Sequence, residues 1–166
     1  MNEASYIVGF DPFRPEESME RIYQSAQALL HGERDLTANC ANIASLIYHS
    51  YPQLSWCGWY FTDYNELVLG PFAGKPACTR IRFGKGVCGT AAKERRVINV
   101  PYVEEFEGHI ACDAETRSEL VVPLVGGNNL LGVLDLDSTL PARFRDADVS
   151  FFESICRLVL TSSRYD

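Results

Sequence analysis

The chain opens with two segments in which apolar residues recur three and four positions apart. The first covers residues 17–31 and ends at Gly32, and the second begins at Asp35 and ends before Pro52. This spacing places the apolar side chains on one face of a helix, and aspartate is a residue type that caps helix N-termini. The pattern therefore predicts two amphipathic helices before any strand.

After the helices, the pattern changes to short aromatic and β-branched runs separated by turn residues. Residue types of this kind favour strands. We predict three strands, at 54–62, 66–72 and 77–83, and a tight hairpin at Tyr64-Asn65 that joins the first two. The chain therefore continues as a series of neighbouring strands.

A glycine-rich turn and a long irregular segment follow. Gly-Lys-Gly at 84–86 opens a run of small residues that predicts a short helix over 87–94. Gly84, Gly86 and Gly89 do not have the spacing of a Walker phosphate loop, and they instead predict a sharp strand-to-helix turn near Cys88. Residues 101–118 show no regular period, and a loop of this length in a compact domain usually has a function. We therefore expect functional residues in this loop.

Regular patterning returns at the end of the chain. Residues 119–125 and 130–136 predict two strands around the turn Gly-Gly-Asn-Asn, and a helix capped near Asp146 follows. Helices, a series of strands and a closing helix define an α+β fold. Its simplest form is an antiparallel sheet with helices packed on one face.

Composition and charge narrow the class of protein. The 166 residues are 46% hydrophobic, which is enough to bury one core without disulfide staples. A net charge of -7 without a cluster of cations argues against nucleic acid and against an anionic membrane surface as partners. No signal-peptide pattern and no run of roughly 18 apolar residues is present. We expect a cytoplasmic protein with reduced cysteines and a small or cationic partner.

Three of the six cysteines have positions typical of packing. Cys40 and Cys156 fall on the apolar stripes of their predicted helices, where a small buried thiol is ordinary core material. Cys57 alternates with Trp56 along a strand, so the two side chains point to opposite faces of the sheet. We assign all three thiols to the core.

The other three cysteines, Cys78, Cys88 and Cys112, lie among glycine, proline and charged residues. Their spacing lacks the short C-x-x-C pairs of structural zinc sites, which disfavours a metal site. Cys112 lies in the irregular loop beside an apolar strand, and Cys78 or Cys88 could reach it and close a disulfide during turnover. This arrangement indicates redox chemistry.

The acidic neighbours of Cys112 act against its reactivity. Asp113 and Glu115 raise the pKa of the thiol and so lower its thiolate fraction. Either His109 or Arg117 offsets them, or a cationic group of the substrate does so as it binds.

Three acids are predicted to converge near these cysteines. Asp135 and Asp137 share one face of a strand because side chains alternate, although a solvated strand end fits the alternation equally well. The predicted hairpin brings Glu119 alongside them. A crowded carboxylate keeps its proton near neutral pH and can act as a general acid, while its neighbours bind an ammonium group. Trp56 and Tyr60 share a strand face and could form a wall of such a pocket.

Four segments together resemble the free methionine-(R)-sulfoxide reductases, which are built on a single GAF domain. The segments are W-C-G-W-Y at 56–60, G-P-F-A-G-K-P-A-C with G-K-G-V-C-G-T-A-A, G-H-I-A-C-D-A-E-T-R-S-E, and G-V-L-D-L-D-S. The resemblance implies a GAF domain over residues 16–166 after an N-terminal extension at 1–15. It also implies a pocket under long loops, on the face of the sheet opposite the helices.

The resemblance further implies an enzyme that reduces free L-methionine-(R)-sulfoxide without a cofactor. Cys112 matches the family nucleophile, which becomes a sulfenic acid, and Cys78 matches the resolving thiol. The resulting Cys78–Cys112 disulfide would be reduced by thioredoxin. Cys88 matches the third family cysteine, whose role the resemblance leaves open.

The same resemblance assigns substrate-binding roles. Five residues match the family's binding acids and aromatics: Glu119, Asp135, Asp137, Trp56 and Tyr60. Either Glu119 or Asp137 would donate the proton to the departing oxygen. Family members often form homodimers, and the sequence leaves the oligomeric state of this chain open. The alternative function is a non-catalytic GAF sensor module that binds a small ligand, which would leave the three-cysteine set unexplained.

Overall fold

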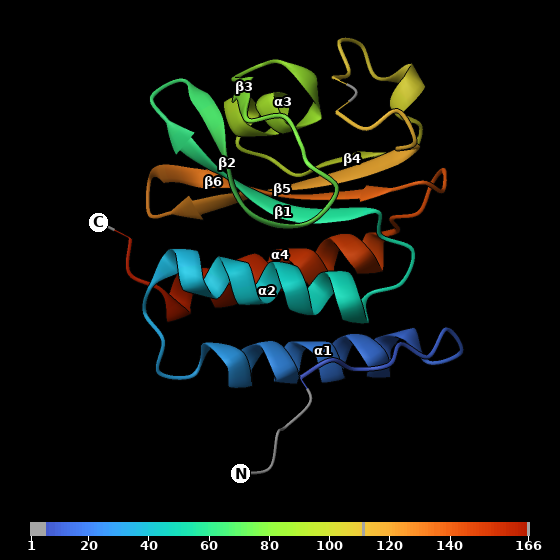
Figure 1. The fold of residues 1–166 in the computed structure, drawn as a ribbon, viewed down its shortest axis with the longest axis vertical. Helices are drawn as coiled ribbons and strands as arrows, with labels where there is room; N and C mark the ends of the chain where they lie inside the picture. The colour runs from blue at the N-terminus through green and yellow to red at the C-terminus, as the bar shows by residue number, and fades with distance from the viewer. Residues whose placement is uncertain (1–5, 111, 166) are drawn as a thin grey trace.

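The strands of this protein form one antiparallel sheet. The computed structural model describes residues 6–110 and 112–165. Within these residues the strands are β1 Trp56–Asp63, β2 Glu66–Gly74, β3 Arg80–Arg82, β4 Ile98–Val100, β5 Ser118–Gly126 and β6 Asn129–Ser138. They form a six-stranded sheet in the order β3-β2-β1-β6-β5-β4 (Figure 1). Every neighbouring pair is antiparallel, as the sequence predicts.

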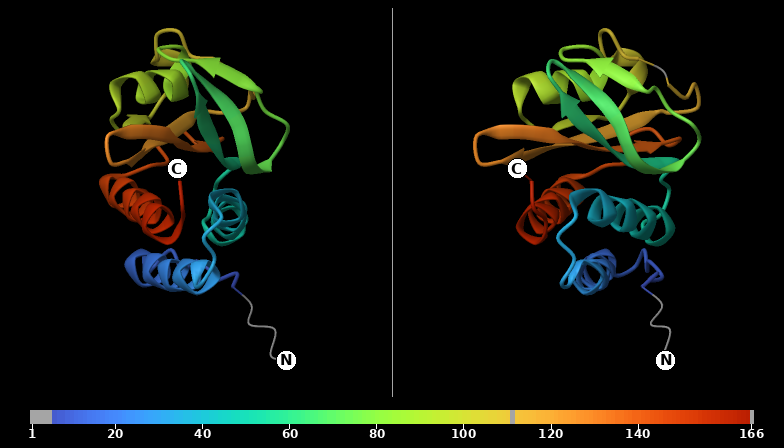
Figure 2. Two further views of the ribbon diagram at one scale, coloured as in Figure 1. Left: turned by 90° about the vertical axis from the view of Figure 1, so that its left-hand side faces the viewer. Right: turned by 60° about the vertical axis from the view of Figure 1, so that its left-hand side comes forward.

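Helices cover both faces of this sheet. The helices are α1 Pro15–Leu30, α2 Leu36–Ser50, α3 Gly86–Glu94 and α4 Asp146–Ser162, with a short 3-10 turn, η1, at Val103–Glu105. Helices α2 and α4 pack side by side on one face, and α1 lies outside them (Figure 2). Helix α3 lies on the opposite face (Figure 1). The α+β class is confirmed, but the expectation that the helices share one face is wrong for α3.

Aspartate side chains accept hydrogen bonds from backbone N–H groups at the N-termini of α2 and α4. Asp35 caps α2 as predicted, because its carboxylate accepts a hydrogen bond of 2.8 Å from the backbone N–H of Ala38. For α4 the sequence predicted a cap near Asp146, but a neighbouring residue makes the capping hydrogen bond. The carboxylate of Asp148 accepts from the backbone N–H of Arg145 at 2.6 Å, and Arg145 is the N-cap residue.

Two apolar clusters lie on the two faces of the sheet. The larger one fills the space between the sheet and α1, α2 and α4, and it includes the thiols assigned to packing, Cys40, Cys57 and Cys156. Leu134 and Leu136 of β6 also belong to it. The smaller cluster lies under α3. The alternation of β6 therefore points its acids toward the α3 face, where the candidate site lies.

Some strand predictions hold and others need correction. A two-residue turn at Tyr64-Asn65 joins β1 and β2, as predicted, with Tyr64 at a positive φ of 54°. The third strand is much shorter than the predicted 77–83, because only Arg80–Arg82 pairs with β2. Strand β4 lies in a segment where no strand was predicted. No helix among the described residues is long and apolar enough to cross a membrane.

The predicted domain boundaries lie at residues 16 and 166. The predicted extension at 1–15 lies partly outside the described residues, since 1–5 are not among them, and so does residue 166 at the predicted end of the domain. The division of the chain at residue 16 stays a prediction.

Candidate active site

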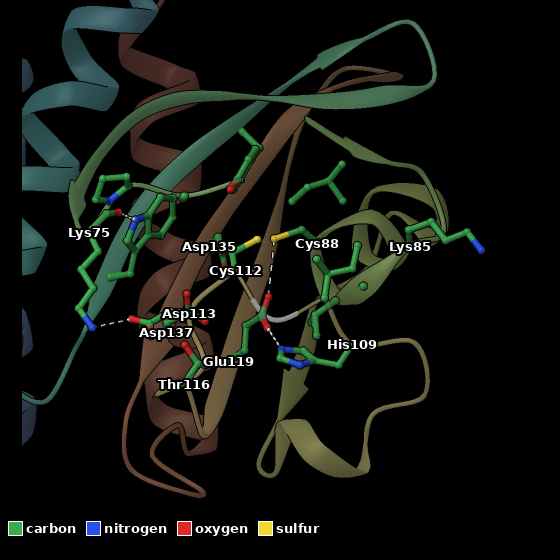
Figure 3. A pocket seen from close by; sticks show the side chains of 18 residues that line it. Lys75, Lys85, Cys88, His109, Cys112, Asp113, Thr116, Glu119, Asp135 and Asp137 are labelled. Carbon is green, nitrogen blue, oxygen red and sulfur yellow. Dashed lines mark hydrogen bonds and ion pairs between the residues drawn. The ribbon is translucent and has the colours of Figure 1, made fainter. Parts of the chain in front are cut away.

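A pocket opens on the α3 face of the sheet. Strands β1, β5 and β6 and the first turn of α3 line it, together with residues from two loops, at 75–77 and at 109–110 and 112–116. Figure 3 shows the side chains that line this pocket. The space that the centre of a water-sized sphere can reach inside it is about 40 Å³. One water molecule needs about 10–15 Å³ by this measure. The enclosed part of the pocket is therefore small.

A disulfide between Cys78 and Cys112 joins the two covering loops. The Cα atoms of the pair are 5.7 Å apart, across 34 positions of sequence. Cys112 is exposed and Cys78 is half-buried, so a reductant in solution can reach the bond. The disulfide that the resemblance implied is therefore present, and it lies over the pocket.

Lys75 holds the same two loops together by charge. Its ammonium group forms ion pairs with the carboxylates of Asp113, at 3.2 Å, and Glu115. The hydrogen bond to Glu115 is the largest cause of a raised pKa of Lys75. Arg117 instead donates to backbone carbonyls. Sequence reasoning named His109, Arg117 or the substrate as the offset for the acids beside Cys112, and it missed Lys75.

The register of the sheet brings the three predicted acids together. Glu119 on β5 lies opposite Asp137 on β6, and Asp135 lies two positions further along the same face. Trp56 on β1 pairs with Asp137 from the other side. All four side chains line the pocket, together with Tyr60, so the predicted convergence is confirmed.

Burial and mutual repulsion favour the protonated forms of these acids. Burial, and then the charge of Asp137, raises the pKa of Glu119 to about 7. The pKa of Asp135 lies well above its usual range because of burial and Glu119. Burial followed by Asp135 acts in the same direction on the pKa of Asp137. The cluster therefore holds protons at neutral pH that exposed carboxyls release.

Cys88 and His109 contact different carboxylate oxygens of Glu119. The Cys88 sulfur lies 3.7 Å from Oε1 of Glu119, and Nε2 of His109 lies 3.4 Å from Oε2 (Figure 3). Cys88 is 3% exposed, and burial, with Asp135 as the next cause, raises the pKa of its thiol well above the usual range. This thiol is therefore a weaker nucleophile than an exposed one. The sequence left the role of His109 undecided.

The aromatic residues do more than line the pocket. The rings of Trp56 and Tyr60 stack at 5.9 Å between centroids. The indole N–H of Trp56 donates to the backbone carbonyl of Lys75 at 3.0 Å, and the Tyr60 hydroxyl donates to the carbonyl of Cys78 at 2.9 Å. Both side chains thus anchor the loop that carries Cys78, which the sequence did not indicate.

Two glycines allow α3 to present Cys88 to the acids. Gly86, at the first position of the helix, has a positive φ of 61°, which glycine adopts without the strain that other residues incur. A Cβ atom at Gly89 would overlap the backbone carbonyl of Arg82. The sharp strand-to-helix turn predicted from these glycines is confirmed, and it sets the position of the Cys88 sulfur.

Comparison with known proteins shows which family has this fold. The protein has a GAF domain, because residues 16–161 match the GAF domain family model. The free methionine-R-sulfoxide reductase of Escherichia coli is 49% identical over 121 residues, which are 73% of this chain and 73% of that protein. The Saccharomyces cerevisiae protein of the same name is 43% identical over 152 residues, covering 87% of this chain and 84% of that protein.

A solved structure agrees with these two relatives. The X-ray structure of free methionine-R-sulfoxide reductase from Neisseria meningitidis, in complex with its substrate, matches with a TM-score of 0.89. The two chains are 33% identical, and the match covers 95% of each. The chain therefore belongs to the free methionine-R-sulfoxide reductase family. Membership of this family makes it an oxidoreductase, as the sequence predicts.

Proposed function

We propose that this protein reduces free methionine-R-sulfoxide to methionine, with Cys112 as nucleophile and Cys78 as resolving thiol. The observation that carries the proposal is the Cys78–Cys112 disulfide, which lies over a pocket lined by Glu119, Asp135 and Asp137. The relatives named for this activity support it.

The first chemical step takes place at the substrate sulfur. The Cys112 thiolate bonds to the sulfoxide sulfur while a carboxyl group protonates the sulfoxide oxygen. The oxygen then ends on the Cys112 sulfur as a sulfenic acid, and methionine leaves. We assign the proton to Glu119, because its pKa of about 7 lies near the pH at which a general acid is most effective.

The second step closes the disulfide. The Cys78 thiol attacks the Cys112 sulfur, and the oxygen leaves as water. Two thiols have then lost two electrons, and the sulfoxide has become a thioether. An external dithiol must reduce the disulfide before the next turnover, and we assign this role to thioredoxin because the bond lies at the surface. A cytoplasmic location is part of the same proposal.

The pocket also explains a preference for the free amino acid. An ammonium group placed beside Asp135 and Asp137 would be stabilised by their carboxylates, whose repulsion it relieves. A methionine residue within a protein has no ammonium group at this position. Trp56 and Tyr60 can contact the methyl and sulfur groups of the substrate.

The test measures NADPH consumption in the presence of thioredoxin and its reductase. We expect turnover of the R epimer, little with the S epimer, and none for Cys112→Ser with either. Cys156→Ser, in the helix–sheet core, serves as a matched control and should retain turnover. No turnover with either epimer in the wild-type protein would reject the proposal. That result would favour the alternative function, a non-catalytic GAF module that binds a small ligand.

A further inference from the structure

One thiol and two carboxylates form a compact cluster at the bottom of the pocket. The sulfur of Cys88, a carboxylate oxygen of Glu119 and one of Asp135 all lie within 4.8 Å of one another. The three residues lie on α3, β5 and β6, so a helix and two strands set these distances. The proposed reaction uses Glu119 to donate a proton and the aspartates to hold an ammonium group, and it gives no role to the three atoms as a set.

The spacing of these atoms fits a small divalent ion. In a tetrahedral zinc site with Zn–S and Zn–O bonds of about 2.3 and 2.0 Å, the sulfur and oxygen are about 3.5 Å apart. The sulfur of Cys88 lies 3.7 Å from Oε1 of Glu119. One ion can therefore contact both atoms with little movement of α3 or β5. Three protein ligands leave a fourth position for water.

Asp135 gives an independent indication of a ligand at this place. The residue is 6% exposed, and its Oδ1 atom is buried without a hydrogen-bond partner among the described residues. Buried polar atoms are nearly always paired, so this oxygen is positioned for a group that the protein does not supply. Asp135, Cys88 and Glu119 lie around the same pocket in Figure 3.

Glu119 is held in an orientation that suits a ligand. Its Oε2 lies 3.4 Å from Nε2 of His109, while Oε1 faces the Cys88 sulfur. Carboxylates that bind metal ions are commonly fixed in this way by an outer partner. His109 therefore orients Glu119 without being a ligand.

We propose that Cys88, Glu119 and Asp135 form a binding site for a thiophilic divalent cation such as Zn²⁺. The ion binds the thiolate and the carboxylates and releases their protons. The site overlaps the position assigned to the substrate ammonium group. The ion and the amino acid therefore compete for the pocket, and this consequence, unlike the site itself, rests on the proposed function.

The test titrates the disulfide form of the protein with Cd²⁺ alone. Cadmium–thiolate bonds give an ultraviolet charge-transfer band, and Cys78 and Cys112 have no free thiol in this form. We expect the band to saturate at one ion per chain and to be lost in Cys88→Ser. In Asp135→Asn, which keeps the thiol, we expect the affinity for Cd²⁺ to fall at least about tenfold.

A matched control separates this thiol from the other free ones. Cys156 lies in the helix–sheet core, so Cys156→Ala should keep the band. The absence of a band in the wild type, or a band that survives Cys88→Ser, would overturn the proposal. If Cys88→Ser does not fold, an unchanged Cd²⁺ affinity in Asp135→Asn would by itself overturn the proposal.

A second titration tests the competition. The double variant Cys78→Ser/Cys112→Ser leaves Cys88 as the pocket thiol and removes the disulfide. We expect free methionine to weaken the apparent Cd²⁺ affinity of this variant, and an unchanged affinity would refute the overlap of the two sites. Cd²⁺ binding through Cys88 without sulfoxide turnover would reject the proposed function alone. Turnover without Cd²⁺ binding would reject the metal site alone.

Discussion

Lys75 carries the charge that offsets the two acids beside Cys112. Its ion pairs with Asp113 and Glu115 reduce the negative potential that these carboxylates impose on the thiol. In the Lys75→Ala variant, with the disulfide reduced, we expect the pH midpoint for alkylation of Cys112 to rise. The rise should be less than about one pH unit, because exposed charges are screened by water and salt. Lys75→Arg should retain the wild-type midpoint, and an unchanged midpoint in Lys75→Ala would exclude this role.

The hydroxyl of Tyr60 positions the loop of the resolving cysteine. In Tyr60→Phe the hydrogen bond to the Cys78 carbonyl is lost, which should cost about 0.5–1.5 kcal/mol. In a single turnover, we expect methionine to form at nearly the wild-type rate and the disulfide to close more slowly. Quenched samples analysed for methionine and for free thiols separate the two steps. Tyr64→Phe, at a side chain that is 96% exposed, is the control, and equal slowing of both steps would contradict the prediction.

Local patterning could predict some of these side chains and not others. The period of two along β6 is enough to place Asp135 and Asp137 on one face, and a two-residue hairpin turn adds Glu119. The partners of Lys75 could not be found in this way, because Glu115 lies 40 positions away in a loop without a regular period. Contacts between two irregular loops depend on the path of the whole chain.

Helix α3 needs a glycine where it approaches the preceding strand. A Cβ atom at position 89 would overlap the carbonyl of Arg82, and a backbone atom cannot move aside as a flexible side chain can. We expect Gly89→Ala to lower the free energy of unfolding by about 1–3 kcal/mol and to displace Cys88. Urea unfolding measures the first effect. Gly9→Ala, where nothing lies within 4 Å, should have little effect, and equal stabilities of the two variants would contradict the prediction.

Short elements were the hardest to predict from sequence. Helices α1, α2 and α4 each have a long apolar stripe, and their existence follows from it. Strand β4 has only three residues, too few for a period to show. Helix α3 is composed mainly of small residues, so its sequence does not indicate which face of the sheet it covers. Its position depends on the strand order of the whole sheet.

The buried acids link the stability of the whole molecule to pH. Burial raises the pKa of Glu119 from 4.5 to about 7 in the folded protein, so the folded state keeps this proton to a higher pH than the unfolded chain. The associated stability is complete below about pH 4.5 and is lost as the pH rises through about 7. Urea unfolding of the disulfide form should show this loss, and Glu119→Gln should show less of it. Glu16→Gln, on the exposed face of α1, should follow the wild type, and identical pH profiles for all three proteins would refute the prediction.

Because of the disulfide over the pocket, turnover depends on a supply of reductant as well as on the supply of sulfoxide. In the oxidised form the Cys112 sulfur is bonded to Cys78, so a new sulfoxide cannot react until the bond is broken. Under the proposed function, each molecule that has reacted waits in the oxidised state for a reductant. In a cell under oxidative load, the rate of methionine repair would then follow the flow of reducing equivalents, while the amount of damaged methionine would have little influence.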